Sequence, residues 1–376
     1  MRAEVHHQSV PSDQHRSSQQ RPRGPRRRAG LALAAAVSLL ATACSAGGGG
    51  DSQDAEDTVV LVTHSSFNVP DEVLDAFTDQ HGYTVEVQAA GDAGELANRL
   101  VLTRNSPLGD VVFGIDNTFA SRVVDEGVLA DYTPATLPAG AEEHVLPDAT
   151  AAGQLTPVDR GDVCVNIDDG WFADNDVPPP ATLEDLTKPA YRDLFVTPGA
   201  ATSSPGMAFL LATISHFGEE DWQDYWRELI ANGAKLTSGW TDAYTVDFTA
   251  GGGDGDRPIV LSYASSPPFT IPEDGEEPTT SALLDTCFRQ VEYAGVIAGA
   301  ANPEGAQALV DFFVGGEFQA ALPESMYVFP VSDEVELPEA WSRFAEVADT
   351  PHDLLPALID QQRDTWLKEW NEVVTR

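Results

Sequence analysis

Residues 58–90, TVVLVTHSSFNVPDEVLDAFTDQHGYTVEVQAA, contain the pattern that decides the fold. The apolar run 58–63 predicts a buried strand, and the segment 70–81 places its apolar residues on one face of a helix. Gly82 stands where a helix commonly ends, and a second strand is expected over 84–88. Strand, helix and strand in this order predict a βαβ unit with parallel strands.

The same alternation continues along the chain. It predicts, in order, a helix carrying Leu96 and Leu100, a strand at 110–114, a second series that begins near Gly161 with strands at 163–167 and 194–196, a helix from Gly206, an amphipathic helix at 222–230 and a strand at 258–263. From about Val291 the pattern predicts helix again, at 306–313 and 318–322, with a last helix around Trp366 and Trp370.

The length and the alternation together predict two α/β lobes. About 320 residues run from the start of the first strand to the end of the chain, which is more than one core usually holds. We expect residues 58–160 plus about 290–335 in one lobe, and about 161–289 plus 336–376 in the other. Loops at the carboxyl ends of the strands then line a cleft between the lobes.

The N-terminus predicts an export signal over residues 1–43. Arginines up to Arg28 precede an apolar run, 29–43, that is too short to span a bilayer. The run ends in LATAC, which resembles a bacterial lipobox and predicts a lipid anchor on Cys44. The alternative is an ordinary signal peptide with a chance cysteine, and the arginines leave both general and twin-arginine export open. Residues 44–57, rich in Gly, Ser and acids, predict a flexible tether.

The charge of the chain is strongly negative. It has 21 basic and 60 acidic side chains, a formal net charge of −39. Such a field disfavours nucleic acid and anionic substrates and attracts cations. A generic acidic surface that favours solubility is the alternative, so the charge alone identifies no ligand.

Two cysteines remain once Cys44 is assigned to the lipid. Cys164 and Cys287 each lie in an apolar, strand-prone run, and an exported protein meets an oxidising environment. We therefore expect a disulfide between them, with two buried free thiols as the alternative.

Four stretches that follow or end predicted strands carry side chains suited to a cationic, aromatic ligand. They are GDVVFGIDN (109–117), TSSPGMAFLL (202–211), LTSGWTDAY (236–244) and VLSYASSP (260–267). In this order and spacing, behind an export signal, they resemble the thiamine-binding subunits of bacterial ABC importers. The resemblance covers nearly the whole chain after the tether. It implies a type II periplasmic-binding-protein fold that holds thiamine, or its phosphates, between the lobes and delivers it to an ABC permease.

Matching positions in that family imply the ligand-binding residues. Asp92 matches a ligand-contacting acid with Ala93 beside it, and Trp240 matches an aromatic wall. Ser203 and Ser204 match a hydroxyl pair at a helix N-terminus, where a phosphate could bind. The other positions that the resemblance assigns to the ligand are Asp116, Asn117, Tyr263, Ala264, Ser265, Ser266, Pro267, Phe269 and Tyr327. Two of them depart from the family, since Phe269 stands for an expected Tyr and Tyr327 for an expected Trp.

The chemistry of thiamine agrees with these residues. An aromatic face attracts a cation by roughly 0.5–2 kcal/mol, and carboxylates can balance the thiazolium charge. Each residue also has a purely structural interpretation: Trp240 as a packed loop residue, Asp116 as a helix cap, Tyr263 as a buried strand residue. Trp222, Trp226, Trp366 and Trp370 are expected in the core, and His64 at the cleft rim or hydrogen-bonded inside.

Two rival functions stay open. A secreted hydrolase would need a nucleophile motif, and the chain has no Gly-x-Ser-x-Gly or Ser-x-x-Lys. An importer subunit for ferric iron or another small cation would want paired tyrosines with His or carboxylates, and Tyr263 has no sequence neighbour of that kind. We expect a monomer that is not an enzyme, with no cofactor, no nucleic-acid partner and membrane contact only through the lipid.

Overall fold

The computed structural model describes residues 57–375, which lie in one compact unit, Gly49–Arg376. The predicted export signal, Cys44 and nearly all of the predicted tether fall outside the described residues. Within 57–375, no helix combines the length and the apolarity that crossing a bilayer requires.

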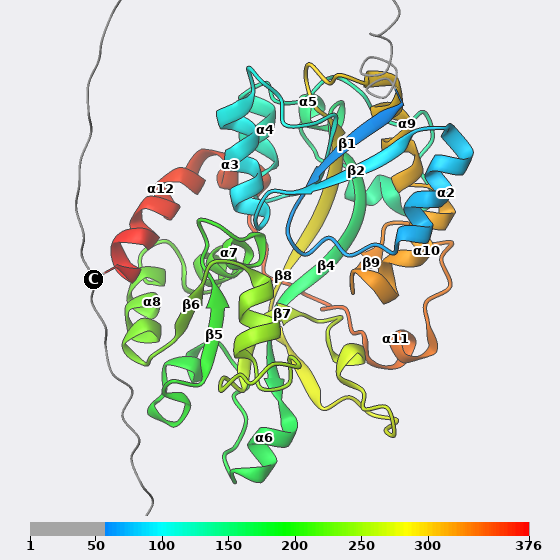
Figure 1. Ribbon diagram of the computed structural model, residues 1–376. Helices are drawn as coiled ribbons and strands as arrows, with labels where there is room; N and C mark the ends of the chain where they lie inside the picture. Colours follow the sequence, from blue (N-terminus) through cyan, green and yellow to red (C-terminus); the bar gives the residue numbers. More distant parts are fainter. Residues whose placement is uncertain (1–56, 376) are drawn as a thin grey trace, which may run out of the picture. The chain divides into compact units, whose positions relative to one another are not determined.

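One mixed sheet organises the described chain, and its strands follow the order β2-β1-β3-β8-β4-β7-β5-β6, with β9 paired to β4 (Figure 1). The first βαβ unit forms as its sequence predicts: β1 and β2 pair in parallel, and α2 (Asp71–His81) connects them along the chain. The strands are β1 (Thr58–Thr63), β2 (Thr84–Ala89), β3 (Val111–Asp116), β4 (Thr156–Asp168), β5 (Phe195–Pro198), β6 (Lys235–Thr237), β7 (Ile259–Tyr263), β8 (Thr280–Val296) and β9 (Phe329–Pro330).

The long strands β4 and β8 form an antiparallel pair in the middle of the sheet. Parallel strands β2, β1 and β3 lie beyond β8, and the parallel pairs of β5 with β6 and β7 lie beyond β4. The predicted lobe boundaries fall inside this pair, at the neighbouring partners Arg160↔Val291 and Gly161↔Gln290. Both long strands therefore run through both of the proposed lobes.

Two sequence predictions about these strands were wrong. The second series of strands and helices begins at Thr156, ahead of the expected Gly161. Residues from Val291, expected to be helical, remain in strand β8 as far as Val296. Residues 291–296 are buried without interruption, so they show neither the alternation of a surface strand nor the stripe of a surface helix. The next helix begins at Pro303.

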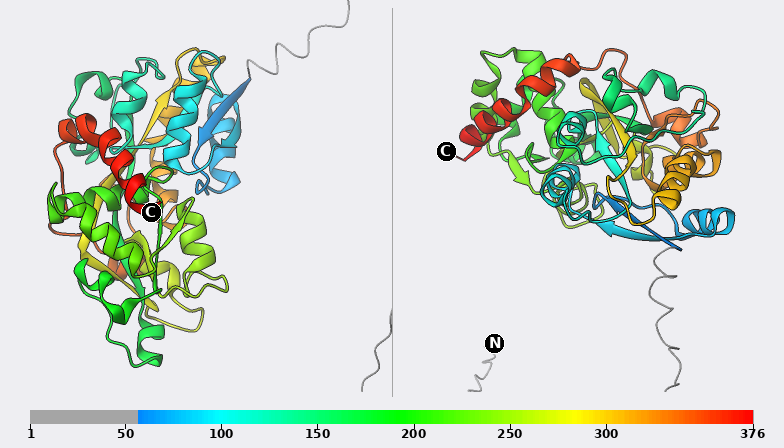
Figure 2. Two further views of the ribbon diagram at one scale, coloured as in Figure 1. Left: turned by 90° about the vertical axis from the view of Figure 1, so that its left-hand side faces the viewer. Right: turned by 90° about the horizontal axis from the view of Figure 1, so that it is seen from above.

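Helices cover both faces of the sheet (Figures 1 and 2). On one face, α2, α9 and α10 pack on β1 and β3 around Phe77, Phe113 and Phe313. On the other, a continuous core runs from α3 and α4 to α7, α8 and α12. The longer helices are α3 (Ala93–Thr103), α7 (Ser204–Phe217), α8 (Trp222–Ala231), α9 (Pro303–Phe313), α10 (Gly316–Ser325) and α12 (Pro356–Val374); the shorter are α4 (Ala120–Asp125), α5 (Ala149–Ala152), α6 (Asp169–Asp174) and α11 (Glu339–Phe344).

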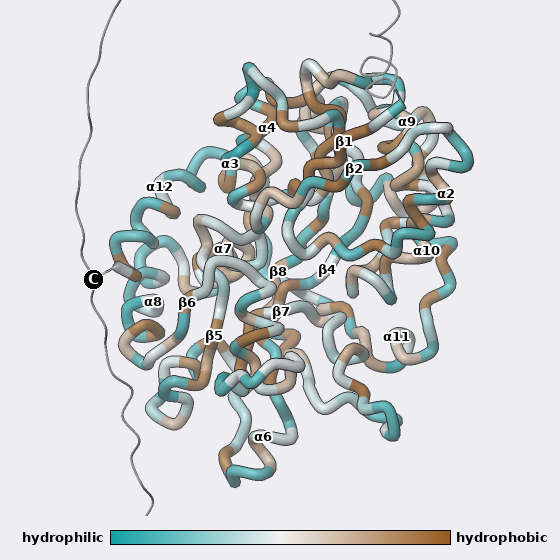
Figure 3. The backbone as a smooth tube through the Cα atoms, in the orientation of Figure 1, coloured by the Kyte–Doolittle hydropathy of each residue, from teal (hydrophilic) through white to brown (hydrophobic). Residues whose placement is uncertain are grey.

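The tryptophans of α8 and α12 lie in the core, which confirms their prediction. Trp222, Trp226, Trp366 and Trp370 are each at most 3% exposed, and Trp226 packs edge-on against Trp370 at a centroid distance of 5.5 Å. Figure 3 shows the same division of polarity, with hydrophobic residues along β1 and hydrophilic residues on much of α12.

Cys164 and Cys287 are joined in a disulfide between β4 and β8. Their Cα atoms are 4.2 Å apart, and both side chains are fully buried. The bond closes a loop with a sequence separation of 123 residues, at a register shift between the two strands. It therefore fastens the two strands that run through both proposed lobes.

Candidate functional site

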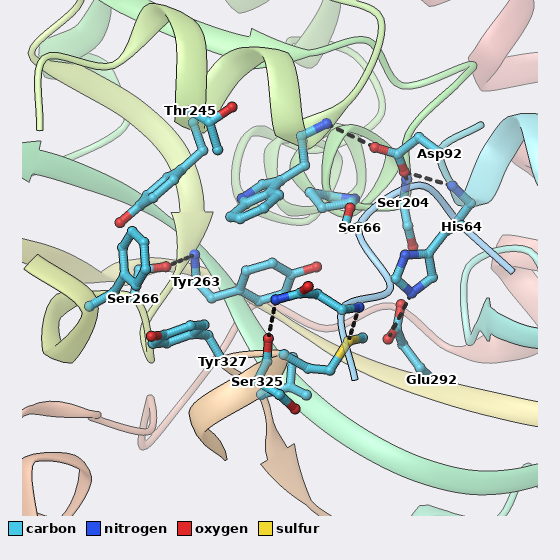
Figure 4. Close-up of a pocket in the computed structure, with 18 residues that line it drawn as sticks. His64, Ser66, Asp92, Ser204, Thr245, Tyr263, Ser266, Glu292, Ser325 and Tyr327 are labelled. Carbon is cyan, nitrogen blue, oxygen red and sulfur yellow. Dashed lines mark hydrogen bonds and ion pairs between the residues drawn. The ribbon is translucent and has the colours of Figure 1, made fainter. Parts of the chain in front are cut away.

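A cavity lies where the ends of several strands meet the N-termini of α3 and α7 and the C-terminal end of α10 (Figure 4). The loop after β1, the start of α3 and the middle of β8 form one side. The segment 240–269, the start of α7 and the segment after α10 complete it. The lining residues are His64, Ser66, Asn68, Asp92, Ala93, Ser204, Pro205, Trp240, Tyr244, Thr245, Tyr263, Ser266, Phe269, Glu292, Ser325, Met326, Tyr327 and Val328.

Eight of the residues expected at the ligand line this cavity. They are Asp92, Ala93, Ser204, Trp240, Tyr263, Ser266, Phe269 and Tyr327. The other six lie behind or beside the wall: Asp116, Asn117, Ser203, Ala264, Ser265 and Pro267.

Asp92 connects three parts of the cavity wall. It caps α3, where Oδ1 accepts from the backbone N–H of Ala93 at 2.6 Å. The same oxygen accepts from the N–H of Ser204 at 3.3 Å, and Oδ2 accepts from the N–H of Trp240 at 2.8 Å. Burial raises the pKa of Asp92, and the hydrogen bonds from these N–H groups oppose that rise. The carboxylate thus ties the β1–α3 side of the cavity to the side that carries Trp240.

Trp240 packs with two other aromatic rings on the side of the cavity opposite His64 and Glu292. Its ring stacks on Tyr244 with centroids 5.0 Å apart, and it lies tilted to Tyr263 at 6.4 Å. The indole Nε1 donates to the hydroxyl of Ser262 at 3.0 Å, which fixes the ring plane. Trp240 is only partly buried, so a face of this rigid aromatic pair is available to the cavity.

Phe269 and Tyr327 extend the aromatic surface from two distant segments. Their rings meet edge to face at a centroid distance of 4.7 Å. Tyr327 has a φ of 57°, a left-handed conformation that costs energy for a side chain of this size. Its carbonyl accepts from the Ser265 hydroxyl at 2.7 Å, so Ser265 supports the wall from behind.

His64 and Glu292 form a buried ion pair on the charged side. His64 Nε2 lies 3.6 Å from Glu292 Oε2, and both side chains are less than 10% exposed. Burial alone lowers the pKa of His64, but the nearby carboxylates of Glu292, Asp92 and Asp116 raise it above its ordinary value overall. Gly114 makes room for this imidazole, because a Cβ there would lie 2.1 Å from a His64 carbon.

Asp159 lies behind Glu292 on the neighbouring strand. The two residues are register partners on β4 and β8, and Asp159 is fully buried. Neither of its carboxyl oxygens accepts a hydrogen bond from a donor among the described residues. Burial and the charge of Glu292 raise the pKa of Asp159 well above its ordinary range. Burial beside Glu292 therefore favours the protonated form of Asp159.

Asp116 supports the wall from inside the protein. It is fully buried, and its carboxylate accepts from the hydroxyls of Ser204 and Thr118 and from the N–H of Phe119. Burial raises its pKa to about 6, against the effect of those hydrogen bonds. Asp116 therefore holds the turn before α4 (Ala120–Asp125) and does not cap that helix, whose N-cap position is Phe119.

The remaining predicted residues also have structural partners. Asn117 exchanges hydrogen bonds with the backbone of Arg289 and Val291 on β8. Ser203 caps α7 by accepting from the N–H of Gly206. The Ser203 and Ser204 hydroxyls, where a phosphate was expected to be able to bind, thus have hydrogen-bond partners within the protein.

Sequence reasoning missed the role of Glu292 in the cavity and left His64 undecided. A single acid within the apolar run Val291–Val296 was the available signal for Glu292, since a charge is rarely buried without a function. Tyr244 belonged to a quoted motif but was not assigned to the ligand. Its ring lines the cavity beside Trp240.

The fold and this aromatic cavity define a ligand-binding protein built on a two-lobed α/β architecture. Residues 72–349 match the family described as bacterial extracellular solute-binding protein, and the chain belongs to that family. The match covers most of the described chain, including every residue that lines the cavity except His64, Ser66 and Asn68.

Proteins of similar sequence belong to the same class of solute-binding proteins. The thiamine-binding periplasmic protein of Escherichia coli (strain K12) is 28% identical over 327 residues, 86% of this chain and 95% of that protein. Its counterpart in Brucella suis biovar 1 is 27% identical over 335 residues, 86% of this chain and 93% of that protein.

Solved structures agree on the fold. The structure titled periplasmic thiamin binding protein has a TM-score of 0.71 and 26% identity, and covers 85% of this chain and 96% of that chain. Iron-bound HitA from Pseudomonas aeruginosa, at 22% identity, has a TM-score of 0.64 and covers 84% and 99%. These periplasmic binding proteins confirm the predicted two-lobed fold class.

Proposed function

We propose that this protein captures thiamine outside the cytoplasm and delivers it to an ABC importer. The observation that carries the proposal is the composition of one cavity: the stacked pair Trp240–Tyr244 faces the carboxylates of Asp92 and Glu292. The names of the similar proteins support the choice of thiamine.

The cavity suits both rings of thiamine. Rigid aromatic faces at Trp240, Tyr244 and Tyr263 stack on a flat aminopyrimidine and attract a thiazolium cation. Carboxylates at the opposite side balance the positive charge and accept from the exocyclic amine. The protein binds and releases the vitamin without changing it chemically, so we assign it no enzymatic activity.

Ferric iron is the second candidate ligand, because a structural neighbour is an iron-bound protein and three tyrosines line the cavity with His64. These tyrosines, Tyr244, Tyr263 and Tyr327, come from different segments. Iron would bind their phenolates, whereas burial raises the pKa of Tyr263 and of Tyr244 and so disfavours the phenolate form. Residues 57–375 contain no group of three or more His, Cys, Asp or Glu side chains arranged to hold a metal ion.

We further propose that a lipid on Cys44 anchors a monomeric protein to the extracytoplasmic face of the membrane. The support is the LATAC sequence at the end of the apolar run and the acidic, Gly-rich stretch that follows it. Replacing Cys44→Ser should release the protein from the membrane fraction. Retention of the variant on membranes would contradict the lipid anchor.

A thermal-shift panel separates the two ligands. Thiamine should raise the melting temperature of the purified protein in proportion to the logarithm of its concentration, as a ligand that binds only the folded state does. Ferric citrate, polyamines and sugars should leave it unchanged. A shift with ferric iron and none with thiamine would reverse the assignment.

A further inference from the structure

His64 is the one side chain that can carry a positive charge among the described residues that line the cavity. Its imidazole is buried, and Nε2 points toward Glu292, whose Oε2 lies 3.6 Å away (Figure 4). That separation is too long for a hydrogen bond, and Nε2 has no hydrogen-bond partner elsewhere in residues 57–375. Charge attraction therefore couples the imidazole to Glu292, so the contact depends on the proton that His64 carries.

Three buried carboxylates face this imidazole from three elements. They belong to Glu292 on β8, Asp92 at the start of α3 and Asp116 at the end of β3. Burial lowers the pKa of His64, but these carboxylates raise it above its ordinary value overall. The protein without ligand therefore keeps a protonated fraction of His64 near neutral pH. The other titratable groups nearby are Asp159 on β4 and Tyr263 on β7, whose pKa values burial raises.

The imidazole has little room to move aside for a ligand. A Cβ at Gly114 would lie 2.1 Å from a ring carbon of His64, and Phe113 packs against the ring at a centroid distance of 5.7 Å. The carbonyl of His64 also accepts from the N–H of Phe67 at 3.2 Å, which fixes the backbone. A second positive charge beside Glu292 thus meets the protonated ring at close range, where like charges repel each other. Loss of the proton relieves that repulsion without moving the ring.

We infer that protonated His64 is the internal counterion of Glu292 before the ligand binds, and that it gives up its proton to solvent when the cation of thiamine takes that place. The inference rests on the proposed function, since thiamine supplies the cation. In this step an N–H bond of the imidazolium breaks, its electron pair stays on the nitrogen, and a buffer base accepts the proton. Thiamine affinity then rises with pH, because protons and thiamine compete for the protein.

Calorimetric titration of the full-length protein with thiamine at pH 7, in PIPES and in ACES, tests the inference without any substitution. The two buffers take up a proton with different heats, so the difference in binding heat gives the number of protons released. We expect release of about 0.3 to 1 proton per thiamine bound, and a dissociation constant that falls about three- to tenfold from pH 6 to pH 8. Binding without proton release would overturn the inference and leave the proposed function standing. Absence of binding would overturn both.

His64→Gln then tests the residue. Glutamine keeps a polar group of similar reach but takes up no proton. We expect the proton release to disappear and the thiamine affinity at pH 6 to rise about three- to tenfold, so that affinity no longer depends on pH over this range. A merely structural role for His64 predicts weaker binding at every pH instead. A folded His64→Gln protein, judged by its melting curve, that still releases the proton or binds more weakly at pH 6 would overturn the assignment.

His216→Gln is the matched control. His216 also pairs with a glutamate, with Nε2 2.7 Å from Glu184 Oε1, but neither residue lines the cavity. Proton release and affinity should match those of the unsubstituted protein. Loss of the release in this variant as well would overturn the role of His64.

Asp159→Asn tests the other nearby source of a proton. Burial beside Glu292 favours the protonated form of Asp159, and an arriving cation favours its ionisation. Asp159→Asn should nevertheless keep the proton release, whatever it does to affinity. Loss of the release in Asp159→Asn, with its retention in His64→Gln, would assign the proton to Asp159 and overturn the inference.

Discussion

The two sides of the cavity differ in chemistry. The side built from the β1 loop, the start of α3 and β8 supplies His64, Asp92 and Glu292, whereas the segment 240–269 supplies aromatic rings. Charges attract a cation over a distance, but water competes for them; aromatic faces exclude water, but they attract weakly on their own. Binding of a cationic ligand therefore depends on both sides of the cavity contacting it at once.

Asp92 is the contact that joins these two sides. Its carboxylate reaches from the N-terminus of α3 to the backbone of Trp240 and Ser204. A single side chain therefore belongs to the charged side and also fixes the position of the aromatic side. Substitutions on each side, and at this contact, should have distinguishable effects.

The largest effect is expected from removing the aromatic side. Trp240→Ala removes stacking, cation–π attraction and water exclusion together, and should weaken thiamine binding by about 2–4 kcal/mol, roughly thirty- to a thousandfold. Calorimetry measures the affinity, and a melting curve on the same variant measures stability. Trp171→Ala, at a partly buried tryptophan of α6 outside the cavity, is the matched control. Unchanged affinity in a folded Trp240→Ala protein would remove Trp240 from the site.

The next effect concerns the strands that carry both sides. Replacing Cys164 and Cys287 by Ala opens a long loop and should lower the free energy of unfolding by about 2–4 kcal/mol. Thiamine affinity should change less than threefold or so, because neither cysteine lines the cavity. Denaturant unfolding and mass spectrometry of alkylated, unreduced protein check the two statements. Two alkylated cysteines in the unreduced protein would contradict the disulfide.

A smaller effect is expected at the contact between the sides. Asp92→Asn removes the charge and one acceptor, and should weaken thiamine binding by about 1–3 kcal/mol. Asp148→Asn is a matched control, because Asp148 also caps a helix through backbone N–H groups but lies on the surface at α5. If the two variants bound thiamine equally well, Asp92 would have only a capping role.

An effect of similar size, visible only as a pH dependence of stability, is expected at Asp116. Its folded-state pKa of about 6 lies above the ordinary 3.8, so the folded protein binds this proton more tightly than the unfolded chain. The free energy of unfolding should therefore fall, by about 1–3 kcal/mol from this group, as pH rises from about 4 to about 6. Asp116→Asn should remove that part of the slope in denaturant unfolding at pH 4, 5, 6 and 7. An identical slope in both proteins would contradict the shifted pKa.

Local patterns in the sequence predicted the fold well and the site only in part. Strand β1, helix α2 and the core tryptophans follow from apolar spacing, which one segment carries by itself. The aromatic side was predicted because Trp240 follows the end of one strand and Tyr263 ends another. Asp116 ends strand β3, yet its carboxylate is fully buried, because it accepts hydrogen bonds from the hydroxyls of Ser204 and Thr118, and Ser204 is brought there by the tertiary fold.

The charged side could not be predicted in the same way. Glu292 lies in the buried C-terminal part of β8, and its importance comes from His64 and Asp159, which are 228 and 133 residues away along the chain. Pairing of β4 with β8 and the turn after β1 bring the three together. That proximity is a property of the topology, which no single segment encodes.

The most direct test of the account is one calorimetric titration with thiamine. The protein used is the purified chain without residues 1–43, carrying Cys44→Ser, which retains the whole compact unit Gly49–Arg376. We predict one site with micromolar or tighter affinity, together with a change in tryptophan fluorescence as the cation meets Trp240. No heat and no fluorescence change up to millimolar thiamine would contradict the central claim that the charged and aromatic sides form one thiamine site.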